Sequence, residues 1–425
     1  MATLRTYTLG CKVNQYETEL IREGLSRIGF REAAPGERAD LCLINTCTVT
    51  GEADGKSRQI IRRLIRENPG AHVVVTGCYA TRAAQEVLAI PGVSEVLTDK
   101  REIPDWLGRF GVRDIPDGIA RFGQRHRAYV KVQDDCLLHC TYYIIPYIRP
   151  RLYSRPVEEI VREVTRLADN GYREVVLTGI HLGHYGLDFN FGKPKSQWIR
   201  LADLVRRLAT LPLDVRIRLS SIEATEVTRE LLEVMAAYPR RVCPHLHICL
   251  QSGSDAVLRR MHRRWGVRRF LDRCRLVREM LDEPCLTTDV IVGFPGETEA
   301  DFQQTIDAVC QAGFSKIHIF PFSARRGTPA AQMPDQIPAE IRQERVERLA
   351  ECERQLRERF LQRLVGRTLD VLLEAPVRAD SFDAVGTACR YVPVRLPKAR
   401  DQLGQVVPVK VTGIIDNTLV GEKLV

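Results

Sequence analysis

The stretch Cys136-Leu137-Leu138-His139-Cys140-Thr141-Tyr142-Tyr143 decides the fold class of this chain of 425 residues. It follows the segment Tyr129–Val132, whose β-branched and aromatic residues predict a strand. A loop that follows such a strand stands where an α/β barrel places its active site. By itself, a pair of cysteines separated by three residues is weak support for a metal site, and a structural or chance occurrence is the simpler interpretation.

Strand and helix patterns alternate around this loop, in six steps over about 200 residues. Helical patterns such as Val157–Asn170 and Glu299–Ala312 separate the strands. The expected strands are Tyr129–Val132, Val175–Thr178, Arg216–Ser220, His247–Gln251, Thr288–Val292 and Lys316–Phe320. Six such steps predict a partial or full α/β barrel, with its active site at the carboxyl ends of the strands.

The segment before this barrel also alternates. Strands are expected at Arg5–Leu9, Leu41–Asn45 and Val73–Gly77, with helices at Gln15–Ile28 and Ser57–Glu67. This order predicts a parallel sheet covered by helices. A stretch with many glycines and prolines, residues 108–123, is typical of a linker. We therefore expect an N-terminal domain over residues 1–120 and a barrel domain over residues 125–365.

The pattern changes after Gly366, where a charged helix that begins near Pro338 ends. Alternating apolar residues then predict short strands separated by Gly, Pro and Asp. The expected strands are Thr368–Glu374, Tyr391–Arg395, Val406–Thr412 and Thr418–Glu422. Residues 366–425 are thus expected to form a small β-barrel of the oligonucleotide-binding type.

The composition is that of a globular protein, with 44% hydrophobic and 28% charged residues. No stretch reaches the roughly 18 apolar residues of a membrane-spanning helix, and the first residues lack a signal-peptide pattern. We therefore expect a cytoplasmic protein. The excess of 63 lysines and arginines over 54 acidic residues allows a polyanionic partner. The odd number of cysteines, 13, argues against a disulfide framework and favours metal or redox chemistry.

Three cysteines each follow the end of an expected strand of the N-terminal domain: Cys11, Cys47 and Cys78. Because the carboxyl ends of parallel strands lie along one edge of a sheet, these thiols can converge. Three thiolates suit a cuboidal iron–sulfur cluster and leave one of its irons open. Three separately buried cysteines are the alternative, since free cysteine is among the most buried residue types.

The residues on both sides of Cys136 and Cys140 resemble the radical S-adenosylmethionine loop of the methylthiotransferase family. The resemblance covers nearly the whole chain, and the segments around the three N-terminal cysteines resemble that family's auxiliary-cluster domain. Matching segments of the loop and barrel are Val132–Asp134, Ile144–Arg149, His245–Ser254 and Thr288–Thr298.

Two further segments are similar to one subfamily, which modifies N6-threonylcarbamoyladenosine in tRNA: Leu9–Asn14 and Thr178–Gly183. The chain from Gly366 onward resembles the small RNA-binding TRAM domain. The resemblance implies an enzyme that adds a methylthio group to C2 of this nucleoside at position 37. It also implies the tRNA anticodon loop as partner, an electron donor such as flavodoxin or ferredoxin, and a monomer.

The family uses two [4Fe–4S] clusters and S-adenosyl-L-methionine. The implied metal ligands are Cys11, Cys47, Cys78, Cys136 and Cys140, of which Cys136 and Cys140 are also the implied catalytic residues. The implied cofactor-binding residues are Tyr142, Thr178, Gly179, Ser220, Glu223, Gln251 and Asp289.

The chain departs from the family at three positions of the loop. Asp135 and Pro150 stand where the family has glycine, and Tyr143 stands at the third cysteine position. A phenol is a hard oxygen ligand, whereas iron–sulfur clusters favour soft thiolates, so the second cluster is doubtful. Ligation by Tyr143 or His139 is one alternative. The others are a catalytically impaired tRNA-binding homologue and a methylthiotransferase that acts on a ribosomal protein.

Two further patterns lead to weaker expectations. The run Arg259–Trp265 could contact tRNA phosphates, with Trp265 as a stacking face, or could be a solvated helix face. His245 and His247 share one face of a strand without an expected metal. The remaining cysteines, which include Cys42 and Cys249, are expected to pack in the core or lie at the surface.

Overall fold

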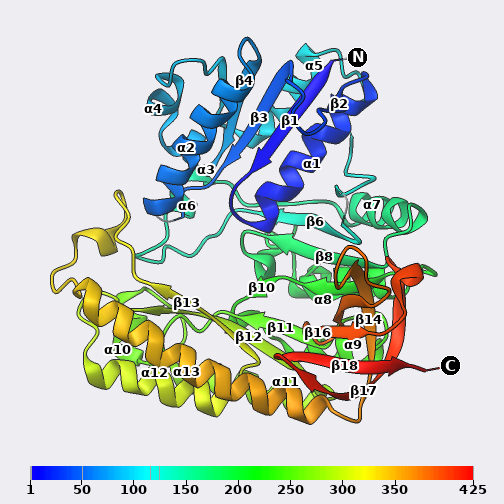
Figure 1. The fold of residues 1–425 in the computed structure, drawn as a ribbon. Helices are drawn as coiled ribbons and strands as arrows, with labels where there is room; N and C mark the ends of the chain where they lie inside the picture. Colours follow the sequence, from blue (N-terminus) through cyan, green and yellow to red (C-terminus); the bar gives the residue numbers. More distant parts are fainter. Residues whose placement is uncertain (1, 50, 115, 124, 425) are drawn as a thin grey trace.

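The computed structural model describes residues 2–49, 51–114, 116–123 and 125–424, and it begins with a parallel five-stranded sheet (Figure 1). The order of the strands in this sheet is β2-β1-β3-β4-β5. The strands are β1 (Thr3–Thr8), β2 (Arg31–Glu32), β3 (Leu41–Thr46), β4 (His72–Gly77) and β5 (Glu95–Leu97). The helices are α1 (Lys12–Arg27), α2 (Gly51–Glu67), α3 (Cys78–Arg82), α4 (Ala84–Leu88) and α5 (Ile103–Arg109).

The central strand β3 explains why this sheet needs helices on both faces. All six of its residues are buried. Leu41 and Leu43 belong to one apolar cluster with residues of α1 and α5, whereas Cys42 and Ile44 belong to another with residues of α2. The expectation that Cys42 packs in the core is confirmed. A strand that is apolar on both faces is typical of a parallel sheet between two helical layers.

The central part of the chain is an open α/β barrel of parallel strands, as expected. It consists of two sheets, with the orders β7-β6-β8-β9 and β10-β11-β12-β13. The strands are β6 (Arg127–Asp134), β7 (Tyr153–Ser154), β8 (Glu174–Gly179), β9 (Arg216–Leu219), β10 (Ser221–Ile222), β11 (His245–Ile248), β12 (Cys285–Val292) and β13 (Lys316–Pro321). Only β7 is antiparallel to its neighbour.

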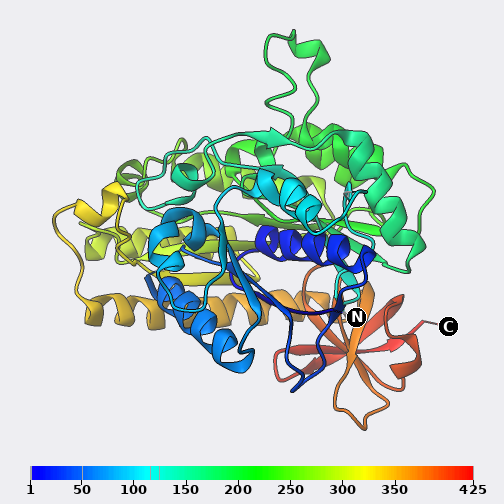
Figure 2. The same ribbon diagram turned by 90° about the horizontal axis from the view of Figure 1, so that it is seen from above.

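Helices cover the outside of this barrel, and a helix of 26 residues, α13, packs on β13 and leads into the C-terminal part (Figures 1 and 2). The helices are α6 (Ile145–Ile148), α7 (Val157–Asp169), α8 (Leu201–Ala209), α9 (Arg229–Ala237), α10 (Asp255–Arg260), α11 (Val267–Met280), α12 (Glu299–Ala312) and α13 (Ala339–Leu364). No helix among the described residues is both long enough and apolar enough to cross a membrane.

The C-terminal part is a small closed barrel with the order β14-β15-β16-β18-β17, which confirms the expected architecture. Its strands are β14 (Thr368–Pro376), β15 (Ala384–Ala388), β16 (Pro393–Leu396), β17 (Val406–Ile415) and β18 (Thr418–Lys423). Strand β15 was not predicted. Tyr391, the expected start of a strand, lies instead in the turn before β16 with a φ of 57°.

Buried arginines join this small barrel to the central one. Glu174 accepts hydrogen bonds from Arg216 at 2.6 Å and from Arg218 at 2.9 Å. The same two guanidinium groups donate to backbone carbonyls of the small barrel, at residues 370, 387, 388 and 389. Burial alone would raise the pKa of Glu174, but Arg218, Arg216 and Arg127 hold it well below its usual range. Glu174 is therefore ionised, and it neutralises charges that could not otherwise be buried.

Removing the carboxylate of Glu174 tests the connection between the central barrel and the small barrel. We expect Glu174→Gln to lower the free energy of unfolding by about 3 to 5 kcal/mol, because it leaves buried guanidinium groups without a counter-charge. The control is Glu158→Gln, since the side chain of Glu158 is 66% exposed. Urea unfolding followed by circular dichroism measures both variants. Equal stability of Glu174→Gln and Glu158→Gln would contradict the role given to Glu174.

Candidate functional site

The three N-terminal thiols lie together at one edge of the sheet. Strand pairing places Thr8 opposite Asn45 and Thr46 opposite Gly77. The strands β1, β3 and β4 therefore end side by side at this edge of the sheet. Gly77 turns the chain before Cys78 with a φ of 101°, and a side chain there would lie 2.3 Å from the carbonyl oxygen of Thr46. Only glycine fits this position.

Asn14 connects these thiols. Its side-chain oxygen lies 4.0 Å from the Sγ atoms of both Cys11 and Cys78. Its amide nitrogen donates to the carbonyl oxygens of Leu9 and Thr46, which fixes the side chain. Removal from water, together with the neighbouring thiols of Cys78 and Cys11, raises the pKa of Cys47 to about 11.

Burial and the neighbouring thiols raise the pKa of Cys11 and of Cys47, so these two groups need a cationic centre to become thiolates, the form that binds metal. The donor set therefore fits a metal or iron–sulfur centre. This arrangement agrees with the convergence expected from the sequence and not with three separately buried cysteines.

The second set of thiols lies in the loop after β6. Cys136 and Cys140 line a cavity of about 160 Å³ at the carboxyl ends of the barrel strands, which we call the thiol cavity. Four of the expected cofactor-binding residues also line it: Tyr142, Glu223, Gln251 and Asp289. The other three do not. Thr178 and Gly179 end β8 beside Gln133, and Ser220 lines a neighbouring cavity.

The walls of the thiol cavity include residues that sequence patterns did not identify. Arg263 donates to the Sγ of Cys140 at 3.4 Å and forms an ion pair with Glu223. Trp265 is buried and donates to Glu223 at 3.0 Å. The expectation that Trp265 offers a stacking face to tRNA is wrong, because Trp265 is only 6% exposed and packs in the core of the barrel. Cys249, expected in the core or at the surface, also lines this cavity.

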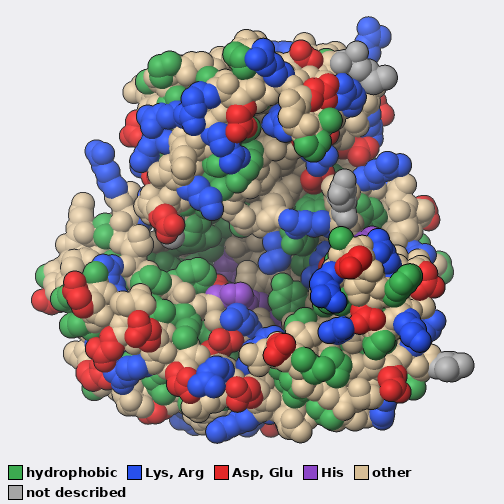
Figure 3. Space-filling model, in the orientation of Figure 1, with side chains coloured by type: hydrophobic (Ala, Val, Ile, Leu, Met, Phe, Trp, Pro, Cys, Tyr) green, Lys and Arg blue, Asp and Glu red, His purple; other side chains and the backbone are tan. Residues whose placement is uncertain are grey.

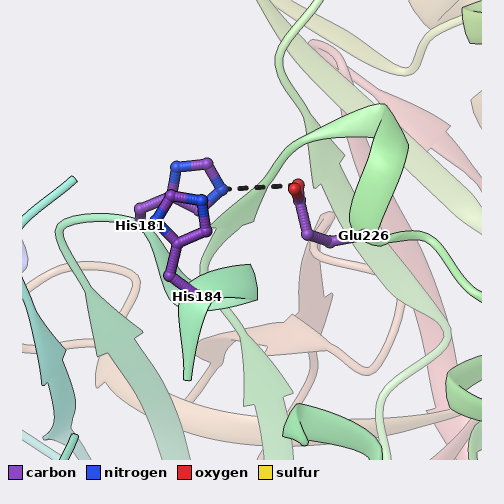
Figure 4. A group of neighbouring side chains, drawn as sticks. All are labelled: His181, His184 and Glu226. Atoms are coloured by element: carbon purple, nitrogen blue, oxygen red, sulfur yellow. Dashed lines mark ion pairs between the residues drawn. The ribbon is translucent and has the colours of Figure 1, made fainter. Parts of the chain in front are cut away.

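Two histidines, His181 and His184, lie beside Glu226 (Figure 4). Nδ1 of His181 is 3.3 Å from the Sγ of Cys136, and its Nε2 is 3.4 Å from a carboxylate oxygen of Glu226. The ring of His184 stacks on that of His181, with 3.6 Å between centroids and 4° between planes. Although burial opposes it, hydrogen bonds to Cys136 and Glu226 raise the pKa of His181 to about 9. Imidazole binds metal in the plane of its ring, so two stacked rings are poorly placed to share one ion.

Tyr143 lies between the two sets of thiols. It packs against Cys78 in one apolar cluster and against Cys136 and Cys140 in another. Burial raises its pKa well above 10, and the thiols of Cys11, Cys136 and Cys78 raise it further. The neutral phenol is thus the stable form, and a neutral phenol is a poor ligand for iron. The loop offers two soft donors and does not fit the three-thiolate set of a radical cluster.

Asp135 and Pro150, the other two loop residues that differ from the family's glycines, differ in their structural effect. Asp135 has a φ of 79°, a left-handed conformation that glycine adopts without strain. An aspartate there costs free energy, which is consistent with the expectation that the loop needs backbone freedom at this position. Pro150 does not have a positive φ, so its conformation does not require glycine.

Buried ion pairs fix the N-terminal thiols, on Cys11, Cys47 and Cys78, relative to the loop thiols, on Cys136 and Cys140. Arg149, which follows the loop, donates to both carboxylate oxygens of Glu17 on α1 at 3.0 Å. It also donates to Asp134 at the end of β6, at 2.7 Å. Lys131 and Lys100 complete the pairing of Glu17. Helix α1 begins directly after Cys11, so this network ties one thiol site to the other.

The comparisons with known proteins agree with this architecture. Residues 3–98 match the uncharacterized protein family UPF0004, and residues 130–309 match the radical SAM superfamily. The chain is 39% identical to the threonylcarbamoyladenosine tRNA methylthiotransferase of Bacillus subtilis, over 97% of this chain and 94% of that protein. The protein of the same name from Chlamydia pneumoniae is 36% identical, over 95% and 98%. The chain belongs to the radical S-adenosylmethionine methylthiotransferase family.

A second kind of relative in this family carries a different name. The tRNA-2-methylthio-N(6)-dimethylallyladenosine synthase of Carboxydothermus hydrogenoformans is 31% identical, over 95% of this chain and 98% of that protein. Among solved structures, the radical S-adenosylmethionine methyltransferase of Kitasatospora setae has a TM-score of 0.54 at 14% identity, over 75% of this chain and 73% of that one. That similarity concerns the fold alone.

The N-terminal thiol site leads to a direct test. We expect replacement of Cys11, Cys47 or Cys78 by Ala to remove about four irons per chain after anaerobic reconstitution, because a cuboidal cluster held by two protein thiolates is labile. Cys42→Ala is the control, since Cys42 is buried on the same sheet without facing the other thiols. Iron analysis and visible absorbance measure the effect. Equal iron in all four variants would refute the site.

Proposed function

We propose that this chain is a tRNA methylthiotransferase that adds a methylthio group to C2 of N6-threonylcarbamoyladenosine at position 37 of tRNA. The observation that carries the proposal is the placement of two thiol sites on opposite sides of one side chain, Tyr143. Such an enzyme needs a sulfur source next to a cofactor cavity. Five relatives named for this nucleoside are 34–39% identical to the chain.

We assign the sulfur source to Cys11, Cys47 and Cys78. A [4Fe–4S] cluster bound there would supply the sulfur that is transferred, at the iron that lacks a protein ligand. Asn14 would hold the thiols at the spacing that the cluster needs. The domain that carries them, residues 1–120, is proposed as the family's N-terminal methylthiotransferase domain.

We assign S-adenosyl-L-methionine to the thiol cavity. Its walls supply the mixture of groups that such a ligand needs: an aromatic ring at Tyr142, carboxylates at Glu223 and Asp289, and an amide at Gln251. Thr178 and Gly179, at the end of β8, remain proposed contacts of S-adenosyl-L-methionine. The tight ion pair of Arg263 with Glu223 would orient that carboxylate toward the cavity.

The ligands that the loop at Cys136 and Cys140 offers do not match those that this function needs. The loop supplies two thiols, and the third donor position is a buried neutral phenol, so we derive no radical step from it. This one observation favours a second candidate, a tRNA-binding homologue without radical chemistry. A ribosomal-protein substrate is not favoured, because the curated relatives cited above are named for tRNA nucleosides.

We assign the anticodon loop to the space between the N-terminal sheet and the barrel. A cavity of about 930 Å³ lies there, and two of its arginines, Arg151 and Arg326, make no ion pair within the described residues. Unpaired cations of this kind bind the phosphate backbone and release counterions. The small barrel at residues 366–425 is proposed as a TRAM domain. A cytoplasmic location, a monomeric state and a flavodoxin or ferredoxin as electron donor complete the proposal.

The activity is tested with tRNA that carries the threonylcarbamoyl group. The chain and its Tyr143→Cys variant are reconstituted anaerobically, incubated with S-adenosylmethionine and a reductant, and the digested nucleosides are analysed by mass spectrometry. We expect the 2-methylthio nucleoside from the variant, and less or none from the unchanged chain. Absence of the product from both proteins would refute the proposed function.

Tyr143→Cys also has a readout that does not depend on the substrate. We expect it to raise the iron content by about four atoms per chain, because it supplies the third soft ligand. Cleavage of S-adenosylmethionine to 5′-deoxyadenosine should rise with it. Tyr147→Cys is the matched control, since it adds a thiol to the same segment at a side chain that is 51% exposed. If the unchanged chain already binds as much iron as Tyr143→Cys, then Tyr143, His139 or an outside ligand serves the iron.

A further inference from the structure

A second cavity, of about 250 Å³, adjoins the thiol cavity and shares Ser221 and Asp289 with it. We call it the histidine cavity, because three of its lining residues are histidines. Figure 3 shows a hollow between the N-terminal sheet and the barrel, with histidine side chains at its floor. The residues used below are Lys12, Ser220, His245, His247, His318 and Tyr391.

All three parts of the chain contribute to this cavity. Lys12 is the first residue of α1, the histidines and Ser220 belong to the central barrel, and Tyr391 comes from the small barrel. The ring of Tyr391 stacks on that of His245, with 4.6 Å between centroids. A binding site assembled from three domains is complete only in the folded full-length chain.

Most charges around the histidine cavity are neutralised within the protein. Arg127 and Arg218, which also line it, pair with Glu174. Asp289 pairs with His247, at 3.2 Å between Oδ1 and Nε2. Lys12 differs, because its ammonium group makes no hydrogen bond or ion pair with any of the described residues. The cavity therefore has one cation that is available to a ligand.

Two buried polar atoms of the cavity also lack a partner within the described part of the chain: Oγ of Ser220 and Nδ1 of His245. Ser220 is 6% exposed and His245 is 4% exposed, so bulk water does not satisfy them. Nε2 of His245 lies 3.2 Å from the hydroxyl oxygen of Thr287. When the hydroxyl donates to Nε2, Nδ1 carries the proton and is free to donate.

Two of the three histidines, His245 and His318, add no positive charge to the cavity. Burial, and then the neighbouring charges of Arg218, the His247 ring and Lys12, keep the pKa of His245 well below its usual range. Burial also lowers the pKa of His318. At neutral pH the rings of His245 and His318 are therefore uncharged hydrogen-bonding groups. A ligand that matches this set carries one negative charge and several hydrogen-bond acceptors.

We propose that the histidine cavity binds the threonyl carboxylate of N6-threonylcarbamoyladenosine, with Lys12 as its counter-ion and with Ser220 and His245 as hydrogen-bond donors. The inference rests on the proposed function, because it assigns a site to the group that gives this substrate its charge. Because the two cavities share a wall, a nucleoside that lies beside the cofactor proposed for the thiol cavity can extend its N6 substituent into the histidine cavity.

The same groups select against the substrate named for the other relatives. A dimethylallyl group is an uncharged hydrocarbon, so its entry would remove Lys12 from water and would leave Ser220 and His245 without partners. A site built to pair with a polar substituent rejects an analogue that lacks it, because its own polar groups are left unsatisfied. Lys12 is thus a specificity-determining residue.

The test compares three anticodon stem-loop RNAs that differ only at position 37. One carries threonylcarbamoyladenosine, the second carries its methyl ester, which has no negative charge, and the third carries unmodified adenosine. Dissociation constants are measured by fluorescence anisotropy with the full-length chain. We expect the acid to bind at least about tenfold more tightly than the ester, which is the usual effect of one charged hydrogen bond.

Two variants assign this preference to the cavity. Lys12→Met keeps the length of the side chain and removes the charge, so it should weaken binding of the acid about tenfold and leave the ester unchanged. Ser220→Ala should reduce the preference for the acid over the ester several-fold. Ser220, unlike Lys12, is far in sequence from the proposed thiol ligand Cys11. Lys193→Met, at an exposed lysine outside the cavity, should bind all three RNAs as the unchanged chain does.

Three results would overturn the inference. The first is equal affinity of the unchanged chain for acid and ester. The second is a preference that survives in both Lys12→Met and Ser220→Ala. The third is an equal loss of affinity for all three RNAs in Lys12→Met, which would make Lys12 a phosphate contact. The proposed function fails separately, if no 2-methylthio product is formed from the acid RNA by the Tyr143→Cys enzyme.

Discussion

The ion pair between Arg149 and Glu17 is the interaction on which the functional part of the molecule depends. Two parallel hydrogen bonds join a guanidinium group at the end of the barrel loop to a carboxylate on the first helix of the N-terminal sheet. Both side chains are buried, so separating them would leave each charge with part of its pairing only: Asp134 for Arg149, and Lys100 and Lys131 for Glu17. The pair therefore fixes the edge that carries Cys11, Cys47 and Cys78 against the loop that carries Cys136 and Cys140.

Tyr143 lies at the contact that this ion pair creates. A thiol at its place would face the thiol cavity and at the same time lie beside Cys78, so a third ligand there would have brought two metal centres close together. The phenol fills this volume with an aromatic ring and keeps the two thiol sets apart. With Tyr143 at this place, the loop offers two thiols and a phenol.

Several arginines of the chain serve its internal structure. Arg149, Arg216, Arg218, Arg263 and Arg325 each pair with a carboxylate inside the protein. The net charge of +9 therefore does not measure the surface available to RNA. What a polyanion meets is the smaller set of cations that lack internal partners, of which Arg151 and Arg326 lie near the thiol loop and Lys12 lies in the histidine cavity.

The sequence by itself determined the three-part architecture and the thiols of both sites, because strand patterns and loop motifs are local and the ends of parallel strands must share an edge. It missed β15 and misplaced Tyr391 and Trp265. It also assigned Cys249 to the core or surface, whereas Cys249 lines the thiol cavity. Only the tertiary structure decided that Tyr143 separates the thiol sites, that His181 contacts Cys136, and that Lys12 and Tyr391 face one cavity. These contacts join residues far apart in the chain, and packing between domains sets them rather than any short-range pattern.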